Sequence, residues 1–246
     1  MAESYRNVLV PVPLVGPGVC ATCHRDVSGP HQRCYRCNSH QEAAGDLLAD
    51  VVVPVSVAFA GKQFAHDLRQ YKRSANETAR KEKQRRLVIL LENFLRVHER
   101  CVAAASDAPD FDVVTSVPST RGLDPHPLGA MLSRTIGLTR HRYRDLLRTG
   151  RHDENRAFHP ERFHTDGDLT GRRVLLVDDT WTTGANAQSA AARLRRAGAE
   201  RVAVVVLGRW FDADHEPASS APARRGCTAP RRRGPRSRST ARAGTS

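Results

Sequence analysis

Residues 174–185 constrain the fold of this chain more than any other segment. The segment begins with four apolar residues, passes through the acidic pair Asp178 and Asp179, and ends in a Thr-Thr-Gly turn before an alanine-rich helix expected over 184–197. A buried strand that runs through a short turn into a helix is the repeating unit of an α/β sheet. The segment therefore predicts a sheet that is parallel where this strand lies.

Further strands and helices are expected on both sides of that segment. Strands are predicted at 51–57, 111–117, 173–177 and 202–207, and helices at 62–72, 77–102 and 126–136. Residues 143–147 fit a strand or a helix, and 148–167 are polar without periodicity, as in a functional or disordered loop. The alternation predicts an α/β fold with a mainly parallel sheet flanked by helices.

The residue types in 174–185 point to a ligand. Ligands of parallel sheets lie at the carboxyl ends of the strands, and the amide groups at a helix N-terminus attract phosphate. The Thr182 and Thr183 hydroxyls can add hydrogen bonds to a phosphate, whereas Asp178 and Asp179 would repel it and suit sugar hydroxyls or a water-bridged metal. An alternative is an ordinary Asp-capped helix. No Gly-Lys-Ser/Thr follows, so the segment is not a Walker loop.

This segment resembles the phosphoribosyl-pyrophosphate loop of type I phosphoribosyltransferases. The resemblance implies that Asp178 and Asp179 contact the ribose 2- and 3-hydroxyls. It also implies a 5-phosphate cradle made of Thr182, Thr183, Gly184, Ala185 and the backbone of Asn186. Trp181 is bulkier than the usual residue and could alter what lies beside the ribose, and Asn186 stands where Thr is common.

A second turn resembles the pyrophosphate loop of the same family. The strand at 111–117 runs into Ser119, Thr120, Arg121 and Gly122. Arg121 can bind an anion through two parallel hydrogen bonds, and the resemblance implies that these residues hold pyrophosphate. The alternative is a plain surface loop.

Two other segments carry weaker resemblances. Residues 148–165, with Phe158 and Arg162 among their polar residues, resemble the mobile loop that closes over the reaction centre, and a disordered insertion is the alternative. Residues 70–72 resemble the Leu-Lys-Tyr region of ComF-like proteins. Lys72 is then either an active-site lysine or a solvated one, and we favour the solvated lysine.

Four cysteines, Cys20, Cys23, Cys34 and Cys37, form two Cys-x-x-Cys pairs separated by ten residues. This spacing predicts a four-thiolate structural zinc site in a segment that lacks a core of its own. Two disulfides or a redox pair are the alternatives, and neighbouring histidines (His24, His31, His40) could substitute as ligands. A four-cysteine knuckle before a phosphoribosyltransferase domain resembles ComF-like competence proteins.

The two remaining cysteines are assigned differently. Cys101 is expected in the apolar face of the long helix as a core thiol, and Cys227 has no assignable role.

Charge and composition complete the expected organisation. Eight of the 39 Lys and Arg residues lie in 217–246, which has no acidic residue, so most of the formal charge of +13 belongs to a tail. We expect a zinc module at 1–48, a phosphoribosyltransferase-like domain at 49–211 and a disordered Arg/Pro-rich tail at 212–246. No secretion signal and no spanning helix are read from the sequence, so a cytoplasmic location without membrane contact is expected.

Three functions remain open. The first is transfer of phosphoribosyl from phosphoribosyl pyrophosphate to an unknown nitrogen acceptor, with Asp178, Asp179 and Arg121 as catalytic residues and magnesium on the pyrophosphate. The second is a catalytically silent binding protein, and the third is a competence-associated protein whose tail makes weak nucleic-acid contacts. The low aromatic content, 5%, argues against base stacking. A homodimer is also possible, and no general base is identified.

Overall fold

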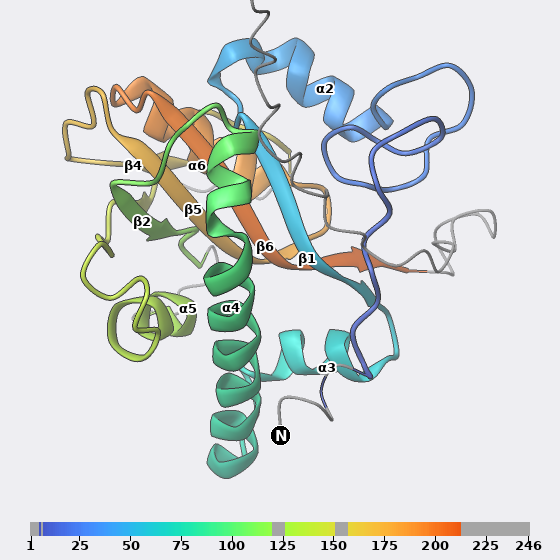
Figure 1. Cartoon of the computed structure of the whole chain (residues 1–246), viewed down its shortest axis with the longest axis vertical. Helices are drawn as coiled ribbons and strands as arrows, with labels where there is room; N and C mark the ends of the chain where they lie inside the picture. Colours follow the sequence, from blue (N-terminus) through green and yellow to red (C-terminus); the bar gives the residue numbers. More distant parts are fainter. Residues whose placement is uncertain (1–4, 6, 120–125, 151–156, 213–246) are drawn as a thin grey trace, which may run out of the picture.

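The computed structural model of the chain describes residues 5, 7–119, 126–150 and 157–212. Figure 1 shows a sheet with helices packed on it. The elements are α2 (Tyr35–Ala44), η1 (Gly45–Leu47), β1 (Val51–Phe59), α3 (Gln63–Gln70), α4 (Glu77–Ala105), β2 (Val113–Ser116), α5 (Pro127–Ala130), η2 (Met131–Thr135), β3 (Arg148–Thr149), β4 (Phe163–His164), β5 (Arg173–Trp181), α6 (Ala185–Arg196) and β6 (Arg201–Phe211).

The main sheet has four strands in the order β1-β6-β5-β2, and every neighbouring pair is parallel. In the centre of the sheet, Leu176 of β5 lies opposite Val204 of β6 and Thr115 of β2. Strands that are covered on both faces need apolar residues at successive positions, which explains the almost unbroken apolar runs of β5 and β6. The mainly parallel α/β fold expected from the sequence is confirmed.

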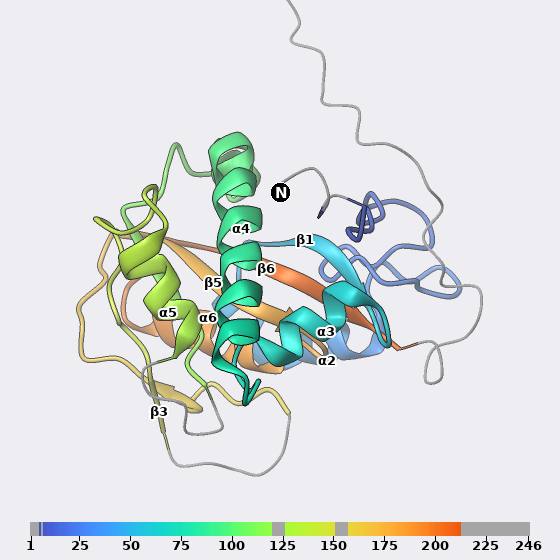
Figure 2. The same ribbon diagram turned by 90° about the horizontal axis from the view of Figure 1, so that it is seen from below.

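Alternate residues of β5 enter two separate cores. Leu175 and Val177 pack with α3, α4 and α5 on one face, whereas Val174 and Leu176 pack with α6 and the N-terminal cysteines on the other. Figure 2 shows the sheet between these two layers. This division follows from the period of two along a strand, and it determines which side each acidic residue of 178–179 can reach.

The long helix α4 agrees with the expected helix at 77–102 except at Cys101. Asn76 caps the helix by accepting a hydrogen bond from Ala79 N at 2.9 Å, and Leu87, Leu91 and Leu95 form the buried stripe. Cys101 is exposed, so the expectation of a core thiol is wrong. The buried neighbour Val102 is one position further along, which rotates Cys101 by about 100° from the core face.

Both central strands are longer than the sequence indicated. β5 continues to Trp181 because β6 also continues, with Thr180 opposite Gly208 and Trp181 opposite Arg209. The acidic pair therefore lies inside the last part of β5 and not after it.

The region that follows β2 also differs from expectation. The helix expected at 126–136 divides into α5 and a π-helical turn, η2. Residues 143–147 form neither a helix nor a strand, and Tyr143 makes a single bridge to Val114. In the polar segment 148–167, the short strands β3 and β4 pair antiparallel and Phe163 is fully buried, so its described part is ordered and packed. Residues 151–156 lie outside the described residues.

The N-terminal residues pack against the sheet domain. Val10 makes an antiparallel bridge to Val57 on the outer edge of β1, and the Ala49 amide donates to Gln188 of α6 at 3.0 Å. In the described part of the chain, no helix is long and apolar enough to cross a membrane. The tail predicted at 212–246 lies outside the described residues from 213 onward, and Cys227 lies there with it.

Candidate functional site

The second residue of the acidic pair is held from the α3 side of the sheet. Tyr71, which follows α3 and is fully buried, donates its hydroxyl to Asp179 Oδ2 at 2.5 Å. The ammonium group of Lys72 forms an ion pair with the same oxygen, and the Lys72 side chain is 19% exposed. The expectation of a solvated Lys72 is therefore wrong, because the short turn after α3 places it against the end of β5.

Because of these contacts, the pKa values of Asp178 and Asp179 shift in opposite directions. Burial opposes the charge of Asp179, but the Lys72 charge and the hydrogen bonds from Lys72 and Tyr71 outweigh it and hold the pKa of Asp179 below its ordinary value. Burial and the neighbouring Asp179 charge raise the pKa of Asp178 to about 7. Burial and Asp179 raise the pKa of Tyr71 well above 10, so its hydroxyl stays protonated and can donate.

The turn after β5 leads directly into the N-terminus of α6. The Ala185 amide donates to Thr183 Oγ1 at 3.3 Å, and the first helical bond runs from Gln188 N to Gly184 O at 2.9 Å. The first amides of a helix have no acceptor within the helix, so the Asn186 amide suits an anion, and the Ala185 amide can exchange its long bond to Thr183 for one to an anion. The structure thus brings the five residues of the expected phosphate cradle together in one turn.

The indole of Trp181 lies against the backbone of Gly184. Gly184 has a φ of 80°, in the left-handed region, and a Cβ at this position would lie closer than 3.0 Å to three indole atoms. Trp181 itself is only 1% exposed and belongs to the core beneath α6. Trp181 therefore shapes the turn from within the core, and Gly184 is needed there for both its φ and its lack of a side chain.

The second expected turn begins beside the first. Val117 N donates to Val177 O at 3.0 Å, so the chain leaves β2 next to the acidic pair. Thr120, Arg121 and Gly122, the expected pyrophosphate residues, lie outside the described residues.

His126, which the sequence reasoning missed, lies where the described chain resumes, just before α5. Burial first, and then the charge of Lys72, lower the pKa of His126 to about 4, so the ring is neutral at pH 7. Its Nδ1 atom is buried without a hydrogen-bond partner in the described part of the chain. The sequence does show a histidine at the start of the helix expected at 126–136, which could have marked it as a candidate site residue. That it lies near Lys72 and Asp179 could not be predicted from the sequence.

The four cysteines of the N-terminal segment form one buried cluster. Their Sγ atoms all lie within 4.8 Å of one another, with 3.7 Å between Cys23 and Cys34. Sulfur atoms bound to one tetrahedral zinc at about 2.3 Å would be separated by about 3.8 Å, so the cluster fits such an ion. The Cys34 amide also donates to the Cys20 sulfur at 3.3 Å, and none of the four is in a disulfide.

The histidines near this cluster are not part of it. His24 Nδ1 contacts the carbonyl oxygen of Pro13 at 2.9 Å, and the His40 ring packs against Phe158 with 5.6 Å between centroids. The donor set is therefore four thiols, as the spacing predicted. The neighbouring sulfur atoms of Cys20 and Cys34 raise the pKa of Cys23, and the charge of buried Arg209, which lies nearby, opposes this rise.

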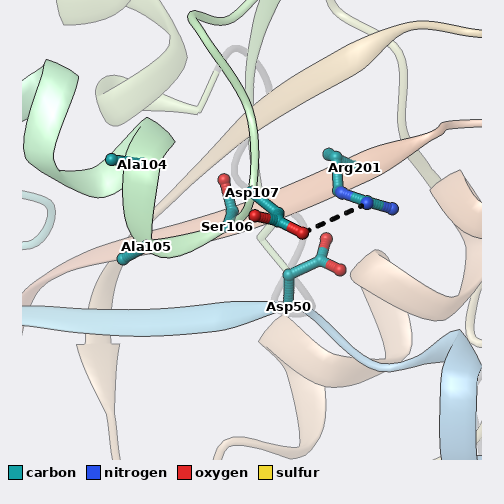
Figure 3. A pocket seen from close by; sticks show the side chains of 6 residues that line it. All are labelled: Asp50, Ala104, Ala105, Ser106, Asp107 and Arg201. Carbon is teal, nitrogen blue, oxygen red and sulfur yellow. Dashed lines mark ion pairs between the residues drawn. The ribbon is translucent and has the colours of Figure 1, made fainter.

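A shallow hollow of about 370 Å³ lies at the other end of the sheet. Figure 3 shows its lining, which comprises Asp50, Ala104, Ala105, Ser106, Asp107 and Arg201. Its charged groups already have protein partners: Arg201 pairs with Asp107 at 3.8 Å, and Asp50 accepts from Val202 N at 2.7 Å and pairs with Arg195. Because Asp50 and Arg201 lie at the amino ends of β1 and β6, the hollow is remote from the acidic pair.

Comparison with known proteins does not assign the chain. The sequence matches no model of a protein family, and a search of curated proteins finds no similar sequence. The function is therefore inferred from the residues at the carboxyl ends of β2 and β5.

Proposed function

We propose that this chain is a ComF-like type I phosphoribosyltransferase, which binds phosphoribosyl pyrophosphate and transfers its phosphoribosyl group to a nitrogen acceptor with release of pyrophosphate. One observation carries the proposal: an acidic pair at the end of a central parallel strand is followed at once by a Thr-Thr-Gly turn at the N-terminus of α6. The proposal is supported because carboxylates suited to sugar hydroxyls and amides suited to a phosphate lie one turn apart, at the edge where parallel sheets bind ligands.

Each part of the donor has a matching group. The 5-phosphate would receive hydrogen bonds from the Thr182 and Thr183 hydroxyls and from the amides of Gly184, Ala185 and Asn186. The acidic pair would accept from the ribose hydroxyls. The pyrophosphate would lie towards the turn after β2, where the resemblance places Thr120, Arg121 and Gly122.

The chemistry requires stabilisation of charge at two places. As the bond from C1 to pyrophosphate breaks, positive charge develops on the sugar and negative charge on the leaving group. Arg121 would stabilise the leaving group, and the acidic pair would lie on the sugar side. Magnesium bound to the pyrophosphate oxygens would neutralise part of the same charge, and carboxylate oxygens such as those of Asp178 are ligands of the type it accepts.

The cysteine cluster supports a separate, structural role for zinc. Four thiolates complete a tetrahedral shell and leave no open position, so the ion would stabilise the N-terminal module without entering the reaction. Such reduced cysteines fit a cytoplasmic location, where thiols are kept from forming disulfides.

Calorimetric titration with phosphoribosyl pyrophosphate and magnesium tests the binding step. We expect binding by the intact chain and none by the Asp178→Ala, Asp179→Ala double variant. Asp166→Ala is the matched control, because this exposed residue lies near the opposite end of α6, where Thr165 O accepts from Arg193 at 3.2 Å. No binding by the intact chain would refute the proposal.

Pyrophosphate release tests the chemical step. The intact chain is incubated with the donor, magnesium and each of a set of purine and pyrimidine bases, and pyrophosphate is measured. Release that depends on one base identifies the acceptor. Donor binding without release for any nitrogen acceptor would make the chain a binding protein that lacks the reaction.

A further inference from the structure

The neighbouring carboxylates of Asp178 and Asp179 have different kinds of partner. Asp179 Oδ2 accepts the Tyr71 hydroxyl at 2.5 Å and also pairs with Lys72. Asp179 is only 7% exposed, so little of this residue is open to a ligand. A carboxylate oxygen has about two acceptor positions, and both are used here.

The groups that hold Asp179 are themselves fixed. Tyr71 is fully buried in the core between α3 and α4, and its carbonyl oxygen accepts from Gln84 Nε2 of α4 at 3.0 Å. The amide of Tyr71 donates to Asp67 O at 2.9 Å, which continues the hydrogen bonding of α3. Tyr71 and Lys72 therefore approach Asp179 from a rigid part of the fold.

Asp178 has different partners. It is half-buried, its Oδ1 accepts the Asp179 amide at 2.8 Å, and the Thr180 amide is a second backbone donor. Within the described residues, Asp178 forms no ion pair and no hydrogen bond with another side chain. These backbone donors come from the strand itself and orient the carboxylate at the end of β5.

We propose, on the basis of the function proposed above, that Asp178 alone binds the sugar and that Asp179 is a positioning residue anchored by Tyr71 and Lys72. In this arrangement the Asp179 carboxylate joins β5 to the turn after α3 and fixes the direction of Asp178 through its amide. Withdrawing Asp179 to meet a sugar would leave Lys72 and the Tyr71 hydroxyl without their acceptor, which is unfavourable in a buried site.

The inference makes a prediction about the class of sugar that the site accepts. A site with two free carboxylates can bind both ring hydroxyls of ribose 5-phosphate. In the proposed site Asp178 Oδ1 already accepts the Asp179 amide, which leaves Oδ2 for a sugar hydroxyl, so one hydroxyl meets a charged group and the other contributes less. The site should therefore tolerate a deoxypentose 5-phosphate at one of the two positions.

Calorimetry with ribose 5-phosphate, 2-deoxyribose 5-phosphate and 3-deoxyribose 5-phosphate tests this prediction. We expect one deoxy analogue to bind about 10- to 100-fold more weakly than ribose 5-phosphate, as for loss of a hydrogen bond to a charged group, and the other to bind within about threefold. Weakening of both analogues by more than about tenfold would overturn the inference.

Variants test the anchoring separately. Asp178→Asn should weaken ribose 5-phosphate binding about tenfold without lowering the melting temperature, because the pKa of Asp178 is raised to about 7 and its charge does not stabilise the fold. Lys72→Met should lower both affinity and melting temperature, because the buried Asp179 loses its cation, and adding Asp179→Asn should restore both. If Asp179 met the sugar, the second substitution would deepen the loss of affinity, and that result would refute the anchoring role.

The two proposals can fail separately. If the intact chain binds neither ribose 5-phosphate nor phosphoribosyl pyrophosphate, the proposed function is wrong and this inference is wrong with it. If the intact chain binds both ligands and the two deoxy analogues are weakened alike, the proposed function stands and only the single-carboxylate site is refuted.

Discussion

Replacing Gly184 with alanine should damage the turn between β5 and α6 for two independent reasons. The φ of 80° at this position is in the left-handed region, which costs an alanine about 1–2 kcal/mol. The added Cβ would lie closer than 3.0 Å to three atoms of the Trp181 indole, and overpacking of this kind costs about 1–3 kcal/mol.

The two costs together lower the free energy of unfolding by about 3 kcal/mol. For a domain of this size each kcal/mol corresponds to about 2–4 °C in melting temperature, so Gly184→Ala should lower it by about 6–12 °C. The affinity for phosphoribosyl pyrophosphate should fall as well, because the shifted amides of the turn no longer converge on one phosphate.

Gly171→Ala is the matched control. Gly171 has a φ of 70°, but a Cβ there would meet nothing within 4 Å, so only the cost of the left-handed conformation remains. We expect a loss of about 1–2 kcal/mol and no change in ligand affinity. Thermal unfolding followed by circular dichroism compares the two variants. Equal losses of melting temperature would show that the Trp181 contact does not constrain the turn, and would refute the reasoning.

Three further predictions concern metal and pH. Cys23→Ser or chelation should release one zinc per chain, which elemental analysis measures. It should also shift tryptophan fluorescence to the red as Trp181 becomes hydrated. Cys101→Ser, at an exposed thiol, should change neither the zinc content nor the fluorescence. Because folding raises the pKa of Asp178 to about 7, the folded chain binds its proton more tightly, so stability in urea should fall as pH rises from about 4 to 7, and Asp178→Asn should reduce that slope. The hydrogen bonds from Arg173 lower the pKa of Asp112 to about 2, so this pair should stabilise the fold above about pH 4 and lose its effect as pH falls towards 2. If Asp112→Asn loses as much stability between pH 4 and pH 2 as the unchanged chain does, this prediction is wrong.

Local patterns were enough to predict much of this structure. The apolar run before Asp178 predicted a central strand, because a strand covered on both faces needs apolar residues at every position. The two Cys-x-x-Cys pairs predicted the cluster of four thiols, because each pair brings two sulfur atoms close together and two such pairs are typical of a structural zinc site. Both signals lie within short segments, where the sequence directly limits the geometry.

Properties that depend on distant partners could not be predicted in the same way. The contact between Tyr71 and Asp179 joins residues 108 positions apart, and only the packing of α3 on β1 and β6 brings the turn after α3 to the end of β5. The extension of β5 to Trp181 depends on the length of β6. Cys101 points outward because of the way α4 is rotated about its own axis against the sheet. The helical pattern of apolar residues does not define the edges of the buried face to a single residue.

Trp181 is bulkier than the usual residue of the loop that residues 174–185 resemble, and its surroundings give this difference a structural reason. It lies in the same buried core as the four cysteines, and its strand partner, Arg209, is close to Cys23. On its other side the indole contacts Gly184 at the start of α6. A smaller residue at 181 would leave a gap in this shared core beside the turn at Gly184. The cysteine cluster and the turn that we propose binds phosphate should therefore be coupled, and Trp181→Ala should lower both zinc retention and affinity for the donor.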